Sequence, residues 1–306
     1  MTTLDERIAE LCGAPVRAMA RLGGGDVADA FKVTLANGRT VFAKTKTDAP
    51  VDFFSIEAAG LRWLSEAGVG SIAEVVGVSD DAPACLVLAW IEPGESRSPE
   101  GERRFGVDLA ALHQSGAPHF GRPDAKPTGS LRVPNDPCET WSEFYATQRL
   151  QPLAEIASER NVLSALSISR LLDVAGRLDE FGGDEAPSRL HGDLWSGNRV
   201  VDVAGRSWLI DPAAHGGHRE FDLAMMRLFG GFSQECFDAY EERHPLSDGW
   251  QDRMALHHLA PLGRACDQVR WTIRRRCGRS FGEALLSADH VWIDLGRKAA
   301  CPHIRS

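Results

Sequence analysis

The chain has 306 residues, 43% of them hydrophobic and 25% charged, a balance typical of a globular protein with one large domain or two lobes. Its formal net charge of −9 argues against a broad phosphate-binding surface, so no nucleic-acid partner is expected. The seven cysteines are scattered without CxxC spacing, which favours reduced thiols over a zinc site or disulfides. There is no signal-peptide pattern and no apolar run of the ~20 residues that cross a bilayer. We therefore expect a cytoplasmic protein without a membrane partner.

The first ninety residues are predicted to be rich in strands. Two apolar runs flank Asn37-Gly38, a dipeptide that tolerates the positive φ of a tight hairpin turn. Apolar side chains at helical spacing predict one helix over residues 53–68, which ends at Gly68. The predicted strands cover residues 16–22, 30–35, 39–45, 72–79 and 85–91. Residues 1–91 are thus expected to form a small N-terminal lobe of strands around one main helix.

The pattern changes after residue 91 and becomes mainly helical. Two short apolar runs around Ala204-Gly205 predict a second, smaller hairpin. The predicted helices cover residues 99–116, 138–161, 167–183, 219–231, 233–244 and 248–262. The sequence therefore predicts an α+β protein with two lobes: an antiparallel β-sheet lobe over residues 1–91 and a larger helical lobe over residues 92–306.

The stretch HGDLWSGN, residues 191–198, carries the strongest functional pattern. Asp193 and Asn198 have the D-x-x-x-x-N spacing of the catalytic loop of protein kinases. Asp211 follows the small hairpin and adds a charged oxygen that suits a hard cation. The pattern predicts that Asp193 orients an attacking hydroxyl while Asn198 and Asp211 bind Mg²⁺. The alternative is a polar loop with a capping Asp and a turn Asn, which the position of Asp211 disfavours.

The N-terminal lobe contains the residue types that bind a nucleotide. Gly23, Gly24 and Gly25 precede a strand, and glycines let backbone N–H groups approach phosphate oxygens closely. Lys44 lies in the third strand, where kinases carry their phosphate-binding lysine, and Glu57 in the next helix can pair with it. Each of these residues alone fits an ordinary surface position or turn. Their order along the chain, followed by the Asp–Asn–Asp pattern, predicts a kinase that uses ATP and Mg²⁺.

The architecture of kinases also implies an adenine-binding hinge after the last strand of the small lobe. In this chain that segment is Ala89, Trp90 and Ile91, and the expected contacts are made by backbone groups.

The motifs together resemble the fructosamine kinase (ketosamine-3-kinase) family. The stretches that carry the resemblance are GGGDVADAFKV, VFAK, IEAAGLRWL, HGDLWSGN and GGHREFDLAMMRLFGGF, within roughly residues 10–262. The family is related to aminoglycoside phosphotransferases and choline kinases and has a protein-kinase-like fold. The run LWSGN with Trp195 distinguishes it from those relatives. The resemblance implies ATP-dependent phosphorylation of the 3-hydroxyl of a ketosamine, small or protein-bound, and a role in deglycation.

The resemblance also assigns roles to residues. Asp193 becomes the catalytic base, Asn198 and Asp211 the metal ligands, and Lys44 with Glu57 the nucleotide-phosphate pair. Trp195 and His215 are candidate substrate-binding residues, although a core position under the loop is an equal alternative for Trp195. For the polar cluster after Asp211, structural support of the catalytic loop is favoured over substrate contact. The members of this cluster are His215, His218, Arg219, Glu220 and Asp222.

The family pattern ends at Gly263, where the basic run RWTIRRRCGRS follows soon after. A shift of one nucleotide in permitted codons for residues 263–276 spells VVHATRFGGPYGDA, which continues the preceding helix in the manner of the family. We therefore hypothesise that residues 263–306 are a frameshift product. Resequencing the gene tests this, and an intact reading frame would reject it.

Two rival functions stay open. A different small hydroxylated amine, such as an aminoglycoside or an amino alcohol, could be the acceptor. A non-catalytic nucleotide-binding or scaffold protein is the other alternative, and the complete set of catalytic residue types argues against it. The sequence leaves the sugar, the amine and the oligomeric state open, with a monomer favoured.

Overall fold

The computed structural model describes residues 2–23, 28–94, 98–122, 124, 132–182 and 184–261. The chain divides into two compact units, each built from several segments. The first unit comprises Met1–Leu112, Gly197–Ala214 and Ser233–Arg243; the second comprises His113–Ser196, His215–Phe232 and His244–Ser306. The first unit thus combines the N-terminal half with two later segments of the chain. A lobe boundary between residues 91 and 92 stays a prediction.

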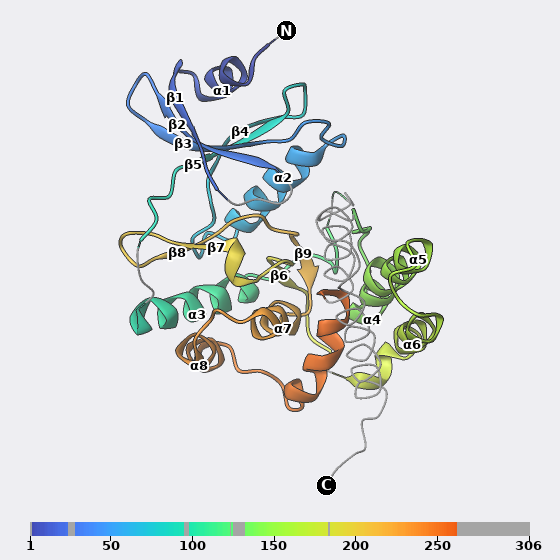
Figure 1. Cartoon of the computed structure of the whole chain (residues 1–306). Coiled ribbons are helices and arrows are strands. Elements are labelled where there is room, and N and C mark those ends of the chain that lie inside the picture. The colour runs from blue at the N-terminus through green and yellow to red at the C-terminus, as the bar shows by residue number, and fades with distance from the viewer. Residues whose placement is uncertain are drawn as a thin grey trace, which may run out of the picture. The chain divides into compact units, whose positions relative to one another are not determined.

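The first unit is built on an antiparallel sheet with the strand order β1-β2-β3-β5-β4 (Figure 1). Its strands are β1 (Val16–Arg21), β2 (Asp29–Leu35), β3 (Thr40–Thr45), β4 (Val75–Ser79) and β5 (Cys85–Ala89). The hairpin predicted at Asn37-Gly38 is confirmed: β2 and β3 pair from Asp29↔Thr45 to Thr34↔Thr40, and Gly38 has φ +84°. The predicted strands of the N-terminal region are therefore all present, with ends that differ by a few residues.

Two helices pack against this sheet. Helix α1 (Leu4–Cys12) begins with a capping box in which Thr3 and Glu6 bond each other's backbone N–H groups, and its Ile8 joins a core cluster with Ala43 of β3. Helix α2 (Phe53–Ser65) contacts β4 and β5 and starts where Asp80 accepts the N–H of Phe54. Because side chains alternate along a strand, Lys44 lies on the opposite sheet face from Ala43.

The other elements of the first unit are helix α3 (Pro99–Gln114), whose last two residues belong to the second unit, the hairpin of β7 (Arg199–Val201) and β8 (Ser207–Leu209), and helix α8 (Gln234–Arg243). The small hairpin predicted around Ala204-Gly205 is confirmed, with Arg199↔Leu209 and Val201↔Ser207 as cross-strand partners. Asp202 accepts backbone N–H groups of Ala204 and Arg206 and closes the turn. Asn198 directly precedes this hairpin and Asp211 follows it closely, so the hairpin fixes the positions of both residues.

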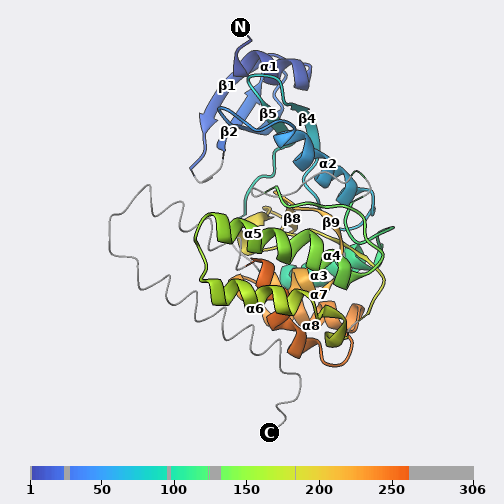
Figure 2. The ribbon, with the colours of Figure 1, turned by 90° about the vertical axis from the view of Figure 1, so that its right-hand side faces the viewer.

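The second unit is mainly helical. It contains α4 (Trp141–Tyr145), α5 (Gln151–Glu159), α6 (Ala165–Ala175), α7 (Glu220–Phe229) and a helix over residues 250–261. Helices α5 and α6 lie side by side (Figure 2). The core of this unit is aromatic at its centre: Trp141 stacks on Tyr145 with ring centroids 4.9 Å apart, and Phe221 meets both rings edge-on. Burial of such large rings is the main source of stability for a unit of this kind.

The sequence predicted one helix over residues 138–161, and the structure corrects this. A π-helical turn, Ala146–Leu150, separates α4 from α5, in which Pro152 occupies the first turn. Within this turn the buried Arg149 donates to the carbonyl of Pro134 at 2.6 Å and to Asn135 Oδ1 at 3.1 Å. A wider turn of this kind re-aims side chains without ending the helix, so the apolar periodicity alone could not reveal it.

The sequence prediction also missed two short strands, β6 (Ser188–Leu190) and β9 (His215–Gly217), which pair antiparallel. Gly216 exchanges backbone hydrogen bonds with Gly121 at 2.7 and 2.8 Å. A Cβ at Gly216 would lie 1.9 Å from the carbonyl oxygen of His119, so only glycine permits this approach. Strands of three residues leave too little alternation to be recognised in a sequence.

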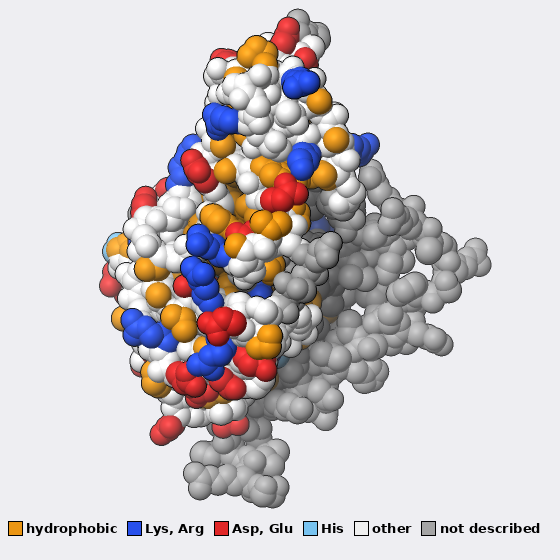
Figure 3. All heavy atoms as spheres, turned by 90° about the vertical axis from the view of Figure 1, so that its left-hand side faces the viewer, with side chains coloured by type: hydrophobic (Ala, Val, Ile, Leu, Met, Phe, Trp, Pro, Cys, Tyr) orange, Lys and Arg blue, Asp and Glu red, His pale blue; other side chains and the backbone are white. Residues whose placement is uncertain are grey.

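Among the described residues, no helix is both long enough and apolar enough to cross a membrane. On the described part of the face in Figure 3, acidic and basic side chains are interspersed. Residues 263–306, to which the frameshift hypothesis applies, lie outside the described residues.

Candidate phosphotransfer site

The first unit brings together three of the predicted site residues. Lys44 Nζ lies 2.6 Å from Glu57 Oε1 and 2.7 Å from Asp211 Oδ1. Strand β3 supplies the lysine, α2 the glutamate, and the chain after β8 the aspartate. The Lys44 and Glu57 side chains are largely buried, whereas the side chain of Asp211 is 45% exposed. The predicted Lys–Glu pair is therefore formed, and it shares its lysine with the predicted metal ligand.

This cluster places one ammonium between two carboxyl groups. Burial raises the pKa of Glu57 to about 7, against the opposing effect of Lys44. Burial also works against the charge of Lys44, but the carboxylates of Glu57 and Asp211 outweigh it and raise the pKa of the ammonium. Lys44 is therefore charged and is shared by the two carboxyl groups.

Asn198 and Asp211 are joined directly. Asn198 Nδ2 donates to the backbone oxygen of Asp211 at 3.4 Å, and the backbone oxygen of Asn198 accepts the N–H of Ile210 at 3.1 Å. The first bond assigns the amide orientation, with Nδ2 as the donor towards Asp211 and Oδ1 as the acceptor atom of the amide. Asp211 has φ +53°, an uncommon conformation for a residue other than glycine, and such strain tends to accumulate at functional positions.

The remaining nucleotide-site predictions are placed only in part. Gly23 is described at the end of β1, whereas Gly24 and Gly25 lie outside the described residues. Ala89 ends β5, and its N–H donates to the carbonyl of Glu74 at 2.9 Å. That amide is therefore already used inside the fold. Trp90 and Ile91 follow β5 in the chain and carry the other backbone groups of the predicted hinge.

The second unit holds the loop that contains Asp193. The N–H groups of His191 and Gly192 donate to Asp222 Oδ2 and Oδ1 at 2.8 and 2.9 Å. His113 Nε2 lies 3.3 Å from Asp222 Oδ2, and both side chains are fully buried. Burial alone would raise the pKa of Asp222, but the hydrogen bonds and His113 lower it. A charged carboxylate in the first turn of α7 thus grips two successive amides directly before Asp193.

The residues after this anchor alternate between buried and exposed. Leu194 is fully buried, while Asp193 is half-buried and Trp195 is 43% exposed. The N–H of Trp195 donates to the backbone oxygen of Asp193 at 3.1 Å, which keeps the loop tightly turned. Trp195 is therefore not a core tryptophan, which was the alternative, and its exposed indole is accessible to a ligand.

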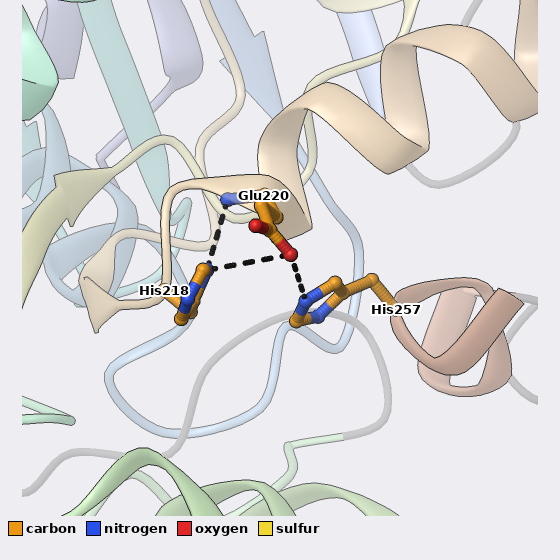
Figure 4. A group of neighbouring side chains, drawn as sticks. All are labelled: His218, Glu220 and His257. Carbon is orange, nitrogen blue, oxygen red and sulfur yellow. Dashed lines mark hydrogen bonds and ion pairs between the residues drawn. The ribbon is translucent and has the colours of Figure 1, made fainter. Parts of the chain in front are cut away.

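Glu220, two residues before Asp222, has a different set of partners. Arg253 donates to both oxygens of its carboxylate at 2.6 and 2.9 Å. His257 Nε2 lies 3.2 Å from Oε2 (Figure 4). Burial opposes the charge of Glu220, but the bonds from His257 and Arg253 bring its pKa down to about 2. Burial lowers the pKa of His257 to about 4, so this imidazole is neutral near pH 7.

His218, Glu220 and His257 are close enough together to be considered as metal ligands. Their bonds argue against that function. Arg253 already neutralises the carboxylate, and His218 Nδ1 accepts the N–H of Glu220 at 3.3 Å. A dication would add net positive charge beside a buried guanidinium, at a high desolvation cost. The group is better explained as a set of polar contacts that connects the start of α7 to the helix over residues 250–261.

Structural support is thus what Asp222 and Glu220 provide. Arg219 forms a two-pronged ion pair with Glu185, at 2.7 and 2.8 Å. The His215 side chain is 1% exposed and stacks on Phe144 with ring centroids 5.3 Å apart. Substrate contact by His215 stays a proposal, and its burial gives that role no support.

Sequence reasoning missed two contributors. His113 lies 109 positions from Asp222, and no local pattern connects the two residues. Glu102 and Arg199 form a buried ion pair beside Asn198, across 97 positions. In the sequence, the sign of the buried pair was a glutamate on the apolar side of α3. An exposed glutamate in a helix looks the same in the sequence, so this sign could not reveal the ion pair.

These features are typical of a class of protein, the kinase-type phosphotransferases: the first unit has a Lys44–Glu57 pair and an Asn198 bonded to Asp211, and the second unit has an anchored loop that carries Asp193. Comparison with known proteins identifies the family. The sequence profile of the fructosamine kinase family matches residues 1–262, and the chain belongs to that family. The match ends one residue before Gly263, where the family pattern stops.

Individual relatives agree with this assignment. A protein of Enterococcus faecium, described as a probable ketoamine kinase, is 34% identical over 238 residues, which are 77% of this chain and 84% of that protein. The crystal structure of a candidate fructosamine-3-kinase from Thermobifida fusca is 36% identical, covers 98% of this chain and 99% of its own, and superposes with a TM-score of 0.83. An aminoglycoside phosphotransferase solved with ADP and hygromycin B shares the fold, with a TM-score of 0.65 at 15% identity, over 98% of this chain and 99% of that one. The predicted α+β, protein-kinase-like fold is therefore confirmed.

Proposed function

We propose that this kinase transfers the γ-phosphoryl group of ATP to the 3-hydroxyl of a ketosamine. The single observation that carries the proposal is the cluster in which Lys44 lies between Glu57 and Asp211, with Asn198 bonded to Asp211. Membership of the fructosamine kinase family supports a ketosamine as the acceptor. Removal of sugar adducts from amines, free or on proteins, would be the physiological consequence.

The chain's own residues fit ATP with Mg²⁺. Asn198 Oδ1 and the half-exposed carboxylate of Asp211 are hard oxygen ligands of the kind that Mg²⁺ takes. Lys44 would bind the phosphates, with Glu57 orienting the ammonium. The bound cation would offset negative charge on the phosphates. Gly23, Gly24 and Gly25 would contact the phosphates through backbone N–H groups, and Trp90 and Ile91 would contact the adenine.

Asp193 would act on the acceptor. Its carboxylate takes the proton of the 3-hydroxyl as the hydroxyl oxygen forms its bond to phosphorus and the bond to ADP breaks. The two amides held by Asp222 fix the chain just before Asp193, so the carboxylate needs little reorganisation. The exposed Trp195 would offer its ring face to the sugar–amine portion of the substrate.

Replacement of the proposed base tests the mechanism. We expect Asp193→Ala to lower kcat about 10²- to 10⁴-fold, the usual contribution of a positioned base, while ADP binding changes little. Phosphate transfer and calorimetric ADP titration measure the two quantities separately. Asp179→Asn, at an exposed position of the same unit, is the matched control and should behave as the wild type. Near-normal turnover of Asp193→Ala would reject the role of Asp193.

A panel of acceptors tests the substrate. Fructose-lysine and ribulose-lysine, free and on a glycated protein, are compared with an aminoglycoside and an amino alcohol. We expect kcat/KM to be highest for a ketosamine, with phosphate on O3 of the product by NMR. Faster transfer to the aminoglycoside or the amino alcohol would reject the proposed acceptor and leave the kinase assignment intact.

A further inference from the structure

A buried ion pair lies directly beside the proposed metal ligand Asn198. The next residue, Arg199, begins β7, and its guanidinium is 1% exposed. Its Nη2 and Nη1 atoms donate to the two carboxylate oxygens of Glu102 in α3, and the second bond is 3.2 Å long. Its Nε donates to Ser207 Oγ on β8 at 2.9 Å, and the ring of Phe105 lies 4.5 Å from the guanidinium carbon. Two parallel bonds to one carboxylate fix the guanidinium in both position and orientation.

Glu102 extends this network to a fourth segment. Its Oε2 also accepts the N–H of Ser233 at 3.1 Å, just before α8 begins. Helices α3 and α8 also pack closely near this bond. A Cβ at Gly106 in α3 would lie only 2.1 Å from the carbonyl oxygen of Cys236 in α8. Arg199 is therefore held relative to α3, β8 and the start of α8 at once. All of these segments belong to the first unit.

Asn198 is held from the other side as well. Its backbone oxygen accepts the N–H of Ile210, and its side-chain amide donates to the backbone oxygen of Asp211. Two attachments therefore set the direction of Asn198 Oδ1. The first consists of the hydrogen bonds to residues 210–211. The second is the peptide bond to Arg199, and Glu102 and Ser207 fix the position of Arg199.

A buried ion pair is a costly way to join a helix to a hairpin. An apolar set of equal volume stabilises a fold as well or better, because both charges must lose their water. Apolar contacts, however, allow small rotations and shifts that a bidentate pair does not. The groups that orient metal ligands typically change metal affinity about 10- to 100-fold when they are removed.

We propose that Glu102 and Arg199 are positioning residues, which hold β7 so that Asn198 presents Oδ1 to a divalent cation beside Asp211. This rests on the proposed function only in that a cation–nucleotide complex binds at Asn198 and Asp211. Neither Glu102 nor Arg199 touches the substrate. Their effect is on the affinity for the cation, and through it on the nucleotide.

Binding of Mn²⁺ to the full-length protein with ADP, followed by electron paramagnetic resonance, measures this without turnover. We expect Glu102→Gln to weaken Mn²⁺ binding at least about tenfold, since an amide cannot maintain the charged two-pronged grip. Arg199→Lys should have a similar effect, because a lysine makes no bidentate bond. Activity of Glu102→Gln should recover at high metal concentration, which a merely unstable protein would not show.

Two control variants separate positioning from stability. Glu242→Gln breaks the neighbouring ion pair from Arg103, which is 3.0 Å long and also connects α3 to α8. Ile8→Val trims a fully buried side chain of α1 and lowers thermal stability, in a core cluster that contains neither Glu102 nor Arg199. Both should bind Mn²⁺ within about twofold of the wild type.

Should Glu102→Gln fail to fold, Ser207→Ala decides, because it removes only the bond to Arg199 Nε. We expect it to weaken Mn²⁺ binding about threefold with a small change in Tm. Wild-type Mn²⁺ affinity in the folded Glu102 or Ser207 variant would overturn the inference and leave the proposed kinase function standing. A wild-type protein that binds no Mn²⁺ with ADP would instead overturn the proposed metal site, and this inference with it.

Discussion

Two clusters of carboxylates, one in each unit, have different numbers of donors around them. In the first unit, Lys44 is shared by Glu57 and Asp211, so one ammonium faces two carboxylates. In the second unit, Glu220 and Asp222 each have more than one donor. Glu220 receives two bonds from Arg253 and lies beside His257, and Asp222 accepts two amides and lies beside His113. The pKa values diverge accordingly: burial raises that of Glu57 to about 7, and donors bring that of Glu220 down to about 2.

This difference bears on the roles that we propose for the two clusters. We expect the Lys44 cluster, with one ammonium between two carboxyl groups and a half-exposed Asp211, to bind a ligand. A carboxylate surrounded by donors is complete within the protein and resists change, because any loss leaves a buried group unpaired. Glu102 of the first unit, with Arg199 and Ser233 as donors, resembles Glu220 and Asp222 in this respect, so the contrast lies between clusters and not between whole units.

The largest expected effect comes from breaking the complete cluster. Glu220→Gln keeps the shape but leaves the buried Arg253 without a charged partner, and we expect a loss of about 3–5 kcal/mol in the free energy of unfolding. Urea denaturation followed by circular dichroism measures it. Glu185→Gln also removes an arginine's charged partner, but the Glu185 side chain is 21% exposed against 0% for Glu220, so it should cost less. A loss below about 1 kcal/mol for Glu220→Gln would remove the contrast between the clusters.

The next effect comes from the Lys44 cluster and should appear in activity. Lys44→Met removes the proposed phosphate ligand, and kcat/KM should fall about 10²- to 10³-fold, as for the loss of one charge-stabilising donor. Stability should change by only about 1 kcal/mol, because Glu57 can take a proton and cease to be an unpaired buried charge. Lys46→Met, two positions along the chain, is the matched control. Activity loss accompanied by unfolding would show that Lys44 is structural.

The elements that follow a repeating pattern could be predicted from the sequence. The hairpin at Asn37-Gly38, the helix over residues 53–68 and the hairpin around Ala204-Gly205 all appear, because turn chemistry and apolar period act over a few residues. The pairing of Lys44 with Glu57 could be predicted as well, since strand alternation and the next helix place both on one sheet face. Lys44 also bonds Asp211, which lies 167 positions away in the sequence, and this contact could be found only in the structure.

Other features arise from long-range contacts that leave no local signal. The strands β6 and β9 are three residues long, and Gly216 in β9 is closely approached by the backbone of His119, which is distant in the sequence. The π-turn before α5 lies within an uninterrupted helical pattern. The Glu102–Arg199 pair joins two residues that look like exposed charges when each is seen alone. Such contacts depend on which surfaces meet in the folded chain.

The complete cluster should also give the protein a pH dependence. In the folded protein burial holds the pKa of His257 at about 4, against 6.5 for an ordinary histidine. Between these values the unfolded chain takes up a proton that the folded chain refuses, so stability is lost as the pH falls from about 6.5 towards 4. The loss is up to about 3 kcal/mol at 1.36 kcal/mol per pKa unit. The groups that face His257 are His218, Glu220 and Arg253.

Urea midpoints between pH 7.5 and 4.5 measure this dependence. His257→Asn should flatten the curve between pH 6.5 and about 4, since it removes the group that refuses the proton. His258→Gln is the comparison: burial also lowers the pKa of His258, but its ring bonds the Ala224 carbonyl and not Glu220, so its removal should leave most of the slope. Below about pH 4.5 both variants should still lose stability, because the Glu220 carboxylate then begins to protonate in the unfolded chain while its folded pKa is about 2. A wild-type midpoint equal at pH 7.5 and pH 5 would mean that the imidazole accepts its proton inside the fold, and that the cluster around Glu220 is less complete than its bonds indicate.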